Sequence, residues 1–466
     1  MTKKTRLLIL AFCVILFFCV TPFIIAYSLG YRVDFEQREI VPTGGIYVRA
    51  YPQATEVIVD SKIVEKPGMF SNSVFVQNLL PKQHSVLIKK DGYFDYQKLL
   101  EVKEKEVTKI ENVTLFENNI VFESILENAE YFSLSPDKKN ILAEGANTKS
   151  LDFYYFGVSS PANPKKYSLA LPYTSLSDIM WSNDSNKALI KTQNLNGTAF
   201  YLLDFSKELQ QTAPVSYLNS SLKDISFNPQ NSNEIFYIKN NILYSVKNSK
   251  ATTIIKNLMT YKVSDGNILW LSSDGILSKS DTSGKLIENL ASEKIAVSAD
   301  EKYSIETISG KTFLASTSAL YLYNPKTKLL ETFGAQIGNY KLLQSPDGKN
   351  MVYHNGSEIY LYSFAEDLKV NGEIMPANGV KLFSSNYPET ISECFWLNNN
   401  YIIFQSGNKI IASEIDYRGN INAVEIPQTY PPSLESKTPQ AVFNSQDGKI
   451  YILTGNTLYS SKKITP

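Results

Sequence analysis

The residue types that most often carry out chemistry are sparse in this sequence. It contains two histidines, His84 and His354, and three cysteines, Cys13, Cys19 and Cys394. So few side chains leave little basis for a histidine-ligated metal or a histidine acid–base pair. Cys13 and Cys19 lie in one apolar run and Cys394 is a lone thiol in a strand-like stretch, so no disulfide framework is expected. The sequence also has no glycine-rich phosphate loop and no nucleophile elbow. We therefore expect no catalytic residues, no metal and no cofactor.

Aspartates in recurring turns offer a second possibility, because carboxylates can bind calcium. A serine stands two residues before each of Asp137, Asp184 and Asp347. Each of these turns carries a single aspartate, which favours capping of the turn backbone by the serine and aspartate over ion binding.

Aromatic residues offer a third possibility, a platform on which sugar rings stack. Trp181, Trp396, Tyr353 and Tyr360 are the candidates. Because they fall in strands that repeat along the chain, we expect them to pack between repeats instead. The segment Pro427–Pro439 is proline-rich and is expected to be a surface loop, either a connector or an interaction loop.

Composition restricts the class of protein. A chain of 466 residues suggests two or more domains. The 46 Lys and Arg residues balance the 46 Asp and Glu residues, so the net charge of zero argues against a nucleic-acid partner. Hydrophobic residues make up 43% and charged residues 20%, which excludes general disorder. The 29 Tyr and 24 Phe residues suit short strands joined by polar turns.

Residues 7–29 form an uncharged apolar run that predicts a membrane-spanning helix. As a helix it would span about 34 Å, against about 30 Å for the apolar core of a bilayer. Lys3, Lys4 and Arg6 precede it, so residues 1–6 are expected in the cytoplasm and the bulk of the chain outside. The alternative is a cleaved signal peptide, but the run is long and Ile25–Ser28 is a poor cleavage site. We expect an uncleaved signal anchor that contacts membrane lipid.

Residues 30–43 are expected to be a linker, and residues 44–116 a small strand-rich module. Apolar and polar residues alternate at period two around Ile46–Ala50, Val57–Asp60 and Val86–Lys89. Proline and glycine turns separate these segments, and none of them carries a helical period. This pattern predicts a β-sandwich.

The order of residues in this module resembles the PEGA domain, a small extracytoplasmic β-sandwich. The resemblance is carried by Gly45-Ile46-Tyr47-Val48, Pro52-Gln53-Ala54, Val57-Ile58-Val59-Asp60, Leu80-Pro81-Lys82-Gln83-His84-Ser85-Val86 and Asp91-Gly92-Tyr93. The eponymous turn is one residue short, so the first turn is expected to be reshaped. The resemblance implies an envelope module that binds or spaces and has no catalytic residues. We expect His84 to pack at a turn, Gly92 to stand where a side chain would be crowded, and Tyr93 to fill the sandwich edge.

Residues 117–466 contain a degenerate repeat. An apolar pair, a Ser or Asn, a turn with Asp, Asn or Gly, and then a strand recur near residues 135, 182, 228, 264, 298, 345, 397 and 445. The spacing of roughly 40–50 residues and the strand content are typical of β-propeller blades. The repeated phrase resembles the repeats of TolB-type and WD40-like propellers. Eight repeats predict eight blades, with seven as the alternative.

The two ends of the repeat region are expected to close the ring. Ala441–Ile464 has room for only about three strands, whereas Asn119–Ile125 precedes the first repeat and has strand character. We predict that this segment is the outer strand of the last blade and pairs with Thr457–Ser461, which removes exposed strand edges.

The chain is therefore predicted to be all-β after its N-terminal transmembrane helix. The favoured function is a non-catalytic envelope protein that binds or scaffolds, with an envelope protein or a glycan as partner. The alternative is an extracytoplasmic hydrolase or lyase that acts at the central channel, which would need converging carboxylates on one rim of the propeller.

Overall fold

The computed structural model is mostly β, with one α-helix, and it forms two compact units. The structure describes residues 3–34, 38–68, 71–145, 147, 150–169, 171, 174–195, 197–207, 213–334, 340–364, 369–370, 373–374, 379–385, 389–428 and 439–464. The first unit combines the chain up to Asn119 with Asp416–Val424, and the second combines Ile120–Ile415 with Glu425–Ile464.

The first unit begins with helix α1 (Lys3–Ser28). From Leu7 to Ala26 its residues are almost all apolar, and none of its 26 side chains is buried. Leu7, Phe18 and Phe23 each expose about 70% of their surface. Among the described residues α1 alone is long and apolar enough to cross a membrane, and a signal sequence would have the same length and composition.

Residues 30–43 are not simply a linker, because they contain a β-hairpin. Strand β1 (Tyr31–Asp34) pairs antiparallel with β2 (Glu39–Pro42). The guanidinium of Arg32 lies 3.5 Å from the centre of the Tyr27 ring, and its Nη1 donates a hydrogen bond to the Tyr27 carbonyl at 2.8 Å. These contacts tie the hairpin to the last turn of the helix.

The sandwich itself consists of two sheets. One has the order β6 (Ser73–Leu79), β3 (Gly44–Tyr51), β9 (Val107–Thr114), and the other has β5 (Ile63–Glu65), β4 (Glu56–Val59), β7 (Gln83–Lys89), β8 (Tyr96–Glu101). The predicted alternation is confirmed in β3, β4 and β7, where Ile46, Val57, Val59, Val86 and Ile88 are almost fully buried in one core.

His84 has the structural role expected of it. Its Nδ1 lies 2.6 Å from Oδ2 of Asp60 and its Nε2 lies 2.8 Å from the Leu80 carbonyl oxygen. Burial alone would raise the pKa of Asp60, but the hydrogen bonds from His84 and from the Ser85 N–H lower this pKa below its ordinary value. The His84 ring therefore ties the turn after β4 to the start of β7.

Tyr93 packs against the sandwich core, as expected. The prediction that Gly92 stands where a side chain would be crowded is wrong. A Cβ on Gly92 would meet no atom within 4 Å, so no crowding selects the glycine. The backbone conformation selects the glycine instead, because residues with a side chain rarely adopt a φ of +80°.

The segment Asp416–Val424 lies within the repeat region of the sequence, but in the structure it belongs to the first unit. The repeat pattern did not predict this. Lys98 on β8 is fully buried, and its Nζ donates hydrogen bonds to the carbonyls of Asp416 at 2.6 Å and Asn420 at 3.1 Å. The Asn420 side chain accepts from the Leu99 N–H and donates to the Gln97 carbonyl, both at 2.8 Å. The buried lysine ammonium is tolerated because these carbonyl oxygens accept its hydrogen bonds and the Asp416 carboxylate lies 3.8 Å away.

The second unit is a series of antiparallel sheets. Among the described residues they are β11 (Ala129–Leu134), β12 (Asn140–Gly145), β13 (Leu151–Gly157), β14 (Ser160–Leu169); β15 (Ser175–Trp181), β16 (Lys187–Asn194), β17 (Gly197–Asp204); β18 (Lys223–Asn228), β19 (Asn231–Lys239), β20 (Ile242–Lys247), β21 (Lys250–Lys256); β22 (Leu258–Ser264), β23 (Asn267–Ser272), β24 (Leu277–Asp281), β25 (Leu286–Asn289); β26 (Tyr303–Ile308), β27 (Lys311–Ser316), β28 (Leu320–Asn324), β29 (Leu329–Gly334); β30 (Lys341–Gln344), β31 (Asn350–His354), β32 (Glu358–Ser363), β35 (Val380–Ser384); β36 (Ile391–Trp396), β37 (Tyr401–Ser406), β38 (Lys409–Glu414), β39 (Ala423–Glu425); and β40 (Gln440–Asn444), β41 (Lys449–Thr454), β42 (Thr457–Ser461) with β10 (Phe122–Glu127). A separate hairpin lies between β32 and β35 in sequence. Its two strands, β33 (Lys369–Val370) and β34 (Glu373–Ile374), have two residues each.

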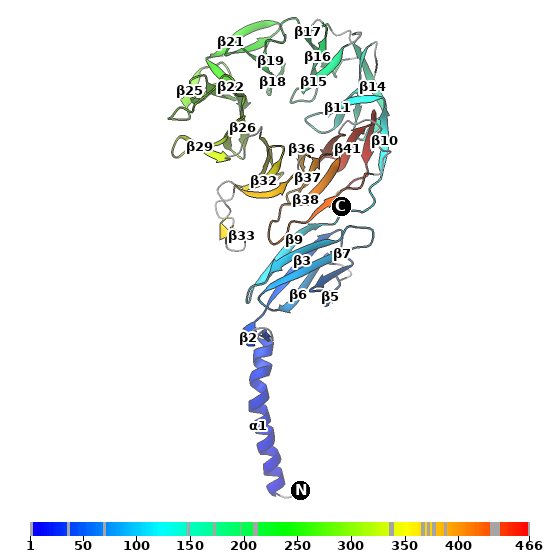
Figure 1. Ribbon diagram of the computed structural model, residues 1–466, viewed down its shortest axis with the longest axis vertical. Helices are drawn as coiled ribbons and strands as arrows, with labels where there is room; N and C mark the ends of the chain where they lie inside the picture. The colour runs from blue at the N-terminus through cyan, green and yellow to red at the C-terminus, as the bar shows by residue number, and fades with distance from the viewer. Residues whose placement is uncertain are drawn as a thin grey trace. The chain divides into compact units, whose positions relative to one another are not determined.

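These sheets are arranged like the blades of a propeller, in chain order around a centre (Figure 1). Consecutive sheets share apolar clusters, such as Phe236 and Leu243 of the third sheet with Tyr261 and Ile268 of the fourth. The first strands of consecutive sheets also contact one another, for example β22 with β26 and β26 with β30, so these strands lie innermost.

The predicted closure is confirmed. Strand β10 pairs antiparallel with β42, in a register that places Phe122 opposite Ser461 and Ser124 opposite Tyr459. Figure 1 shows cyan β10 beside the red strands from the C-terminal end of the chain. Behind this pairing, Phe132 and Ile141 of the first sheet share a core with Leu458 of the last.

The prediction of a repeat turn near residue 298 is wrong. Ser298–Asp300 precedes the innermost strand β26, whereas the turn equivalent to the others is Ser309–Gly310, between β26 and β27. The latter turn has no aspartate, so the phrase at Ser298 looked more like the repeat than the true turn does.

The first prediction concerns Gly419, which has a φ of +63° and approaches β8 so closely that a Cβ would lie 2.0 Å from the Leu99 carbonyl oxygen. In the full chain, Gly419→Ala should displace Asp416–Val424 and speed amide exchange at Leu99 by at least tenfold, measured by hydrogen–deuterium exchange. Gly92→Ala is the matched control, because it imposes similar backbone strain without a clash. Equal exchange at Leu99 in both variants would contradict the docking.

The second prediction concerns ring closure. Replacing residues 122–127 with a Gly-Ser segment of equal length removes the β10–β42 ladder and the buried Phe122. The second unit should lose roughly 3 kcal/mol or more of unfolding free energy, measured by chemical denaturation. The same replacement in β25, whose four residues are all exposed, should cost much less. Equal losses would show that β10 is only a connecting segment.

Candidate functional site

The residues considered as an aromatic platform are packed inside the second unit, as expected. Trp181 contacts the core between the first two sheets, and its Nε1 donates to Ser133 Oγ at 3.0 Å. Trp396 is 8% exposed, and its Nε1 donates to the Leu343 carbonyl at 2.9 Å. Tyr353 and Tyr360 stack with ring centres 5.0 Å apart. All four rings therefore support contacts within or between sheets.

The serine–aspartate turns cap themselves, which confirms the structural interpretation of those aspartates. The hydroxyls of Ser135, Ser182 and Ser345 donate to the aspartate two residues later at 2.6, 2.6 and 2.7 Å. Burial would raise the pKa of Asp137, but the hydrogen bonds from Ser135 and from the Lys139 N–H lower it. Among the described residues, no group of three or more Asp, Glu, His and Cys side chains could hold a metal ion.

Cys394 and His354 are core residues. Cys394 is 3% exposed, and burial raises its thiol pKa to about 12, so it is not a reactive thiolate at neutral pH. His354 is 2% exposed, and burial followed by repulsion from Lys341 lowers its pKa to about 4, so its ring is neutral. Most of Pro427–Pro439 lies outside the described residues.

The innermost strands carry charged side chains that are partly paired. Lys262 on β22 lies 2.9 Å from Glu306 on β26, and Lys341 on β30 lies 3.3 Å from Glu393 on β36. Both pairs link neighbouring sheets and remain about half exposed, so each contributes little to stability.

Glu144 is a buried carboxyl with a raised pKa on the strand next to the innermost strand of the first sheet. It lies on β12, is 6% exposed, and accepts a hydrogen bond from the Leu176 N–H of the next sheet. Burial, followed by repulsion from Glu130, raises its pKa to about 7. A carboxyl with such a pKa can exchange a proton near neutral pH, but its burial keeps it away from a solute.

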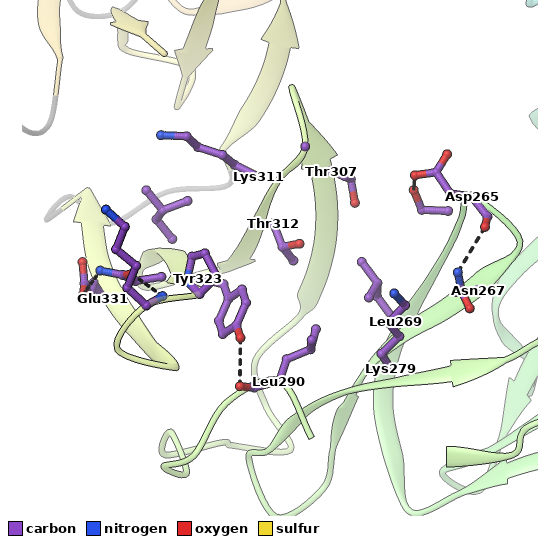
Figure 2. Close-up of a pocket in the computed structure, with 16 residues that line it drawn as sticks. Asp265, Asn267, Leu269, Lys279, Leu290, Thr307, Lys311, Thr312, Tyr323 and Glu331 are labelled. Atoms are coloured by element: carbon purple, nitrogen blue, oxygen red, sulfur yellow. Dashed lines mark hydrogen bonds between the residues drawn. The ribbon is translucent and has the colours of Figure 1, made fainter. Parts of the chain in front are cut away.

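A groove lies between the fourth and fifth sheets and is here called the interblade groove (Figure 2). It has a volume of about 560 Å³. It is lined by Ser264, Asp265, Asn267, Leu269, Lys279, Leu290, Thr307, Gly310, Lys311, Thr312, Leu322, Tyr323, Asn324, Pro325, Lys326 and Glu331. The lining comes from the first turns of both sheets, from the turn between β28 and β29, and from strand residues between them.

The groove combines an apolar interior with a cationic rim. Leu269, Leu290 and Leu322 supply apolar surface, and the Tyr323 hydroxyl donates to the Leu290 carbonyl at 3.0 Å, which joins the two sheets (Figure 2). Because the turns of a meander alternate between its two ends, the lining turns lie on one face of the unit. The sequence carries no local signal for the groove, because its residues belong to two different repeats.

The polar lining includes groups that are not satisfied internally. Thr307 Oγ1 is buried and has no hydrogen-bond partner among the described residues. The ammonium groups of Lys279 and Lys326 have neither an ion pair nor a hydrogen bond to any described residue, and that of Lys311 contacts only the rings of Tyr362 and Phe364, at 5.8 and 5.6 Å. The carboxylate of Glu331, by contrast, accepts from Asn324 at 2.7 Å.

Three solved structures illustrate what this chain is similar to. BamB from Moraxella catarrhalis is 12% identical over 73% of this chain and 97% of its own, with a TM-score of 0.44. The WD40 domain of SCAP from fission yeast is 12% identical over 74% and 98%, with a TM-score of 0.47. Hsv2 from Kluyveromyces lactis is 12% identical over 65% and 100%, with a TM-score of 0.38. No protein-family model matches the chain, and no curated protein matches its sequence.

By its own sheet order and its closing ladder, the second unit has the architecture of a β-propeller. The chain also has an apolar N-terminal helix that suits an anchor or a signal sequence. The fold alone leaves the function and the ligand open.

The third prediction follows from the raised pKa of Glu144. The protonated carboxyl fits the core, and ionisation is easier in the unfolded chain, so this residue removes stability as the pH rises from about 4.5 to about 7. Glu144→Gln keeps the acceptor for Leu176 and should raise the unfolding free energy at pH 8 by roughly 1–3 kcal/mol, with the gain vanishing near pH 4.5.

Chemical denaturation of both proteins between pH 4.5 and 8 measures this difference. Glu123→Gln, at an exposed position, should leave stability unchanged at both ends. A Glu144→Gln gain that does not depend on pH would contradict the assigned ionisation.

Proposed function

We propose that this protein is a single-pass envelope protein whose propeller is held outside the membrane as a non-catalytic binding scaffold. The observation that carries the proposal is helix α1, which has 26 residues, no buried side chain and no acidic residue. An apolar helix whose side chains remain unburied along its length is costly in water, whereas a bilayer covers it. Lys3, Lys4 and Arg6 at its start favour a cytoplasmic N-terminus.

The module after the helix is proposed to be a PEGA-like stalk or wall contact. Its two-sheet sandwich supports this proposal, as does the contact of His84 with Asp60 and Leu80 at the positions that carry the resemblance. The propeller is proposed to have eight blades. Eight sheets among the described residues and the β10–β42 ladder support that number.

A binding role is favoured over catalysis by the nature of the two candidate sites. The interblade groove offers apolar surface and uncompensated cations, which suit recognition. The alternative, an enzyme acting at the central channel, is favoured by the raised pKa of Glu144. Its carboxyl is buried and already hydrogen-bonded, so it fits a core position better than contact with a substrate. The partner is proposed to be an envelope protein or a glycan.

The fourth prediction tests the topology. In a background with Cys13→Ala and Cys19→Ala, a single Lys250→Cys on the exposed start of β21 should react with an impermeant maleimide on intact cells or spheroplasts. Thr2→Cys should react only after lysis, since it precedes the helix. Buried Cys394 should remain unlabelled.

Mass spectrometry of the purified protein should also find residues 3–28 retained. Labelling of Thr2→Cys on intact cells, protection of Lys250→Cys, or a mature N-terminus near residue 28 would contradict the proposal.

A further inference from the structure

We propose that the interblade groove binds a short acidic segment of a protein partner that carries an apolar side chain between carboxylates. This inference rests on the proposed function and narrows its partner from an envelope protein or glycan to an acidic polypeptide.

The argument begins with the charges around the groove. Lys279, Lys311 and Lys326 come from three strands or turns of two sheets, and none has a carboxylate partner among the described residues. Elsewhere in the described unit, lysines such as Lys262, Lys341 and Lys381 do lie within 4 Å of a carboxylate. The lining also holds two carboxylates, those of Asp265 and Glu331, so three ammonium groups leave an excess of one positive charge, which favours anionic groups.

The interior of the groove selects among anionic ligands. Leu269 is 8% exposed, and Leu290 and Leu322 complete an apolar surface of branched aliphatic side chains. Sugar rings prefer flat aromatic faces, and Tyr323 is the one aromatic residue among the described lining residues. An aliphatic interior is better matched by a leucine-like side chain, whose burial excludes water from both surfaces.

Two further features fit a peptide in this position. The buried hydroxyl of Thr307 has no partner among the described residues, so it can donate a hydrogen bond to a peptide carbonyl or carboxylate without displacing an existing bond. The volume of about 560 Å³ lies within the roughly 300–1,000 Å³ typical of ligand sites, which is enough for a few residues.

The test uses the full chain in phosphatidylcholine nanodiscs and fluorescein-labelled pentapeptides. Glu-Glu-Leu-Glu-Glu should bind saturably by fluorescence anisotropy, and the binding should weaken as salt rises. Gln-Gln-Leu-Gln-Gln and Glu-Glu-Ser-Glu-Glu should each bind at least fivefold more weakly, because one lacks the charges and the other the apolar side chain. Tetragalacturonate serves as the glycan probe, in competition.

Variants connect binding to the groove. Lys279→Gln with Lys326→Gln should weaken binding of Glu-Glu-Leu-Glu-Glu roughly tenfold, and Thr307→Val should weaken it a fewfold. The matched control is Lys247→Gln with Lys250→Gln on the third sheet, two exposed lysines outside the groove, which should leave the affinity unchanged.

Absence of saturable peptide binding, equal loss in both double variants, or tighter binding of tetragalacturonate than of the peptide would overturn the inference. These outcomes are independent of the maleimide topology test, so the groove can fail as a peptide site while the membrane-anchored scaffold stands.

Discussion

The second unit depends on the antiparallel pairing of β10 with β42. Each sheet has two faces to bury, and a linear series of sheets would leave one face uncovered at each end. By placing β10 in the last sheet, the chain brings Leu458 against Phe132 and Ile141 of the first sheet. The pairing joins residues more than three hundred positions apart, and it makes every sheet an interior member of a ring.

The ring in turn explains where a ligand could be recognised. The innermost strands contact one another, for example β22 with β26. Some of their charged side chains form ion pairs between neighbouring sheets, as Lys262 does with Glu306. Farther from the centre, the fourth and fifth sheets leave a groove between their turns. Among the described residues, the hydroxyl of Thr307 there is buried without a hydrogen-bond partner, which costs stability unless a ligand compensates it.

Much of this architecture could be predicted from the sequence because the informative patterns are local. Period-two alternation identified β3, β4 and β7, and the serine–aspartate phrases located most of the turns. Closure was predictable because the last repeat was one strand short. The turn Ser309–Gly310 was missed because it lacks the aspartate of its counterparts.

Other features had no local signal. Asp416–Val424 docks on β8 through Lys98, a lysine that looks like any exposed strand residue until its carbonyl partners from a distant segment are known. The interblade groove was invisible for the same reason, since Lys279, Lys311 and Lys326 are spread over two repeats and resemble ordinary surface lysines. Both the docking of Asp416–Val424 and the interblade groove therefore depend on contacts between residues that are distant in the sequence.

The most direct measurement of the central claim, that β10 closes the ring, is a disulfide across the ladder. Ser124 and Tyr459 are opposite one another, so Ser124→Cys with Tyr459→Cys, in a background without Cys13 and Cys19, should oxidise to a disulfide in the native full chain. The account predicts near-complete cross-linking, seen by mass spectrometry of the linked peptides, and none for Ser124→Cys paired with Lys250→Cys. Failure of the Ser124–Tyr459 pair to cross-link in the folded protein, or equal cross-linking of the control pair, would contradict it.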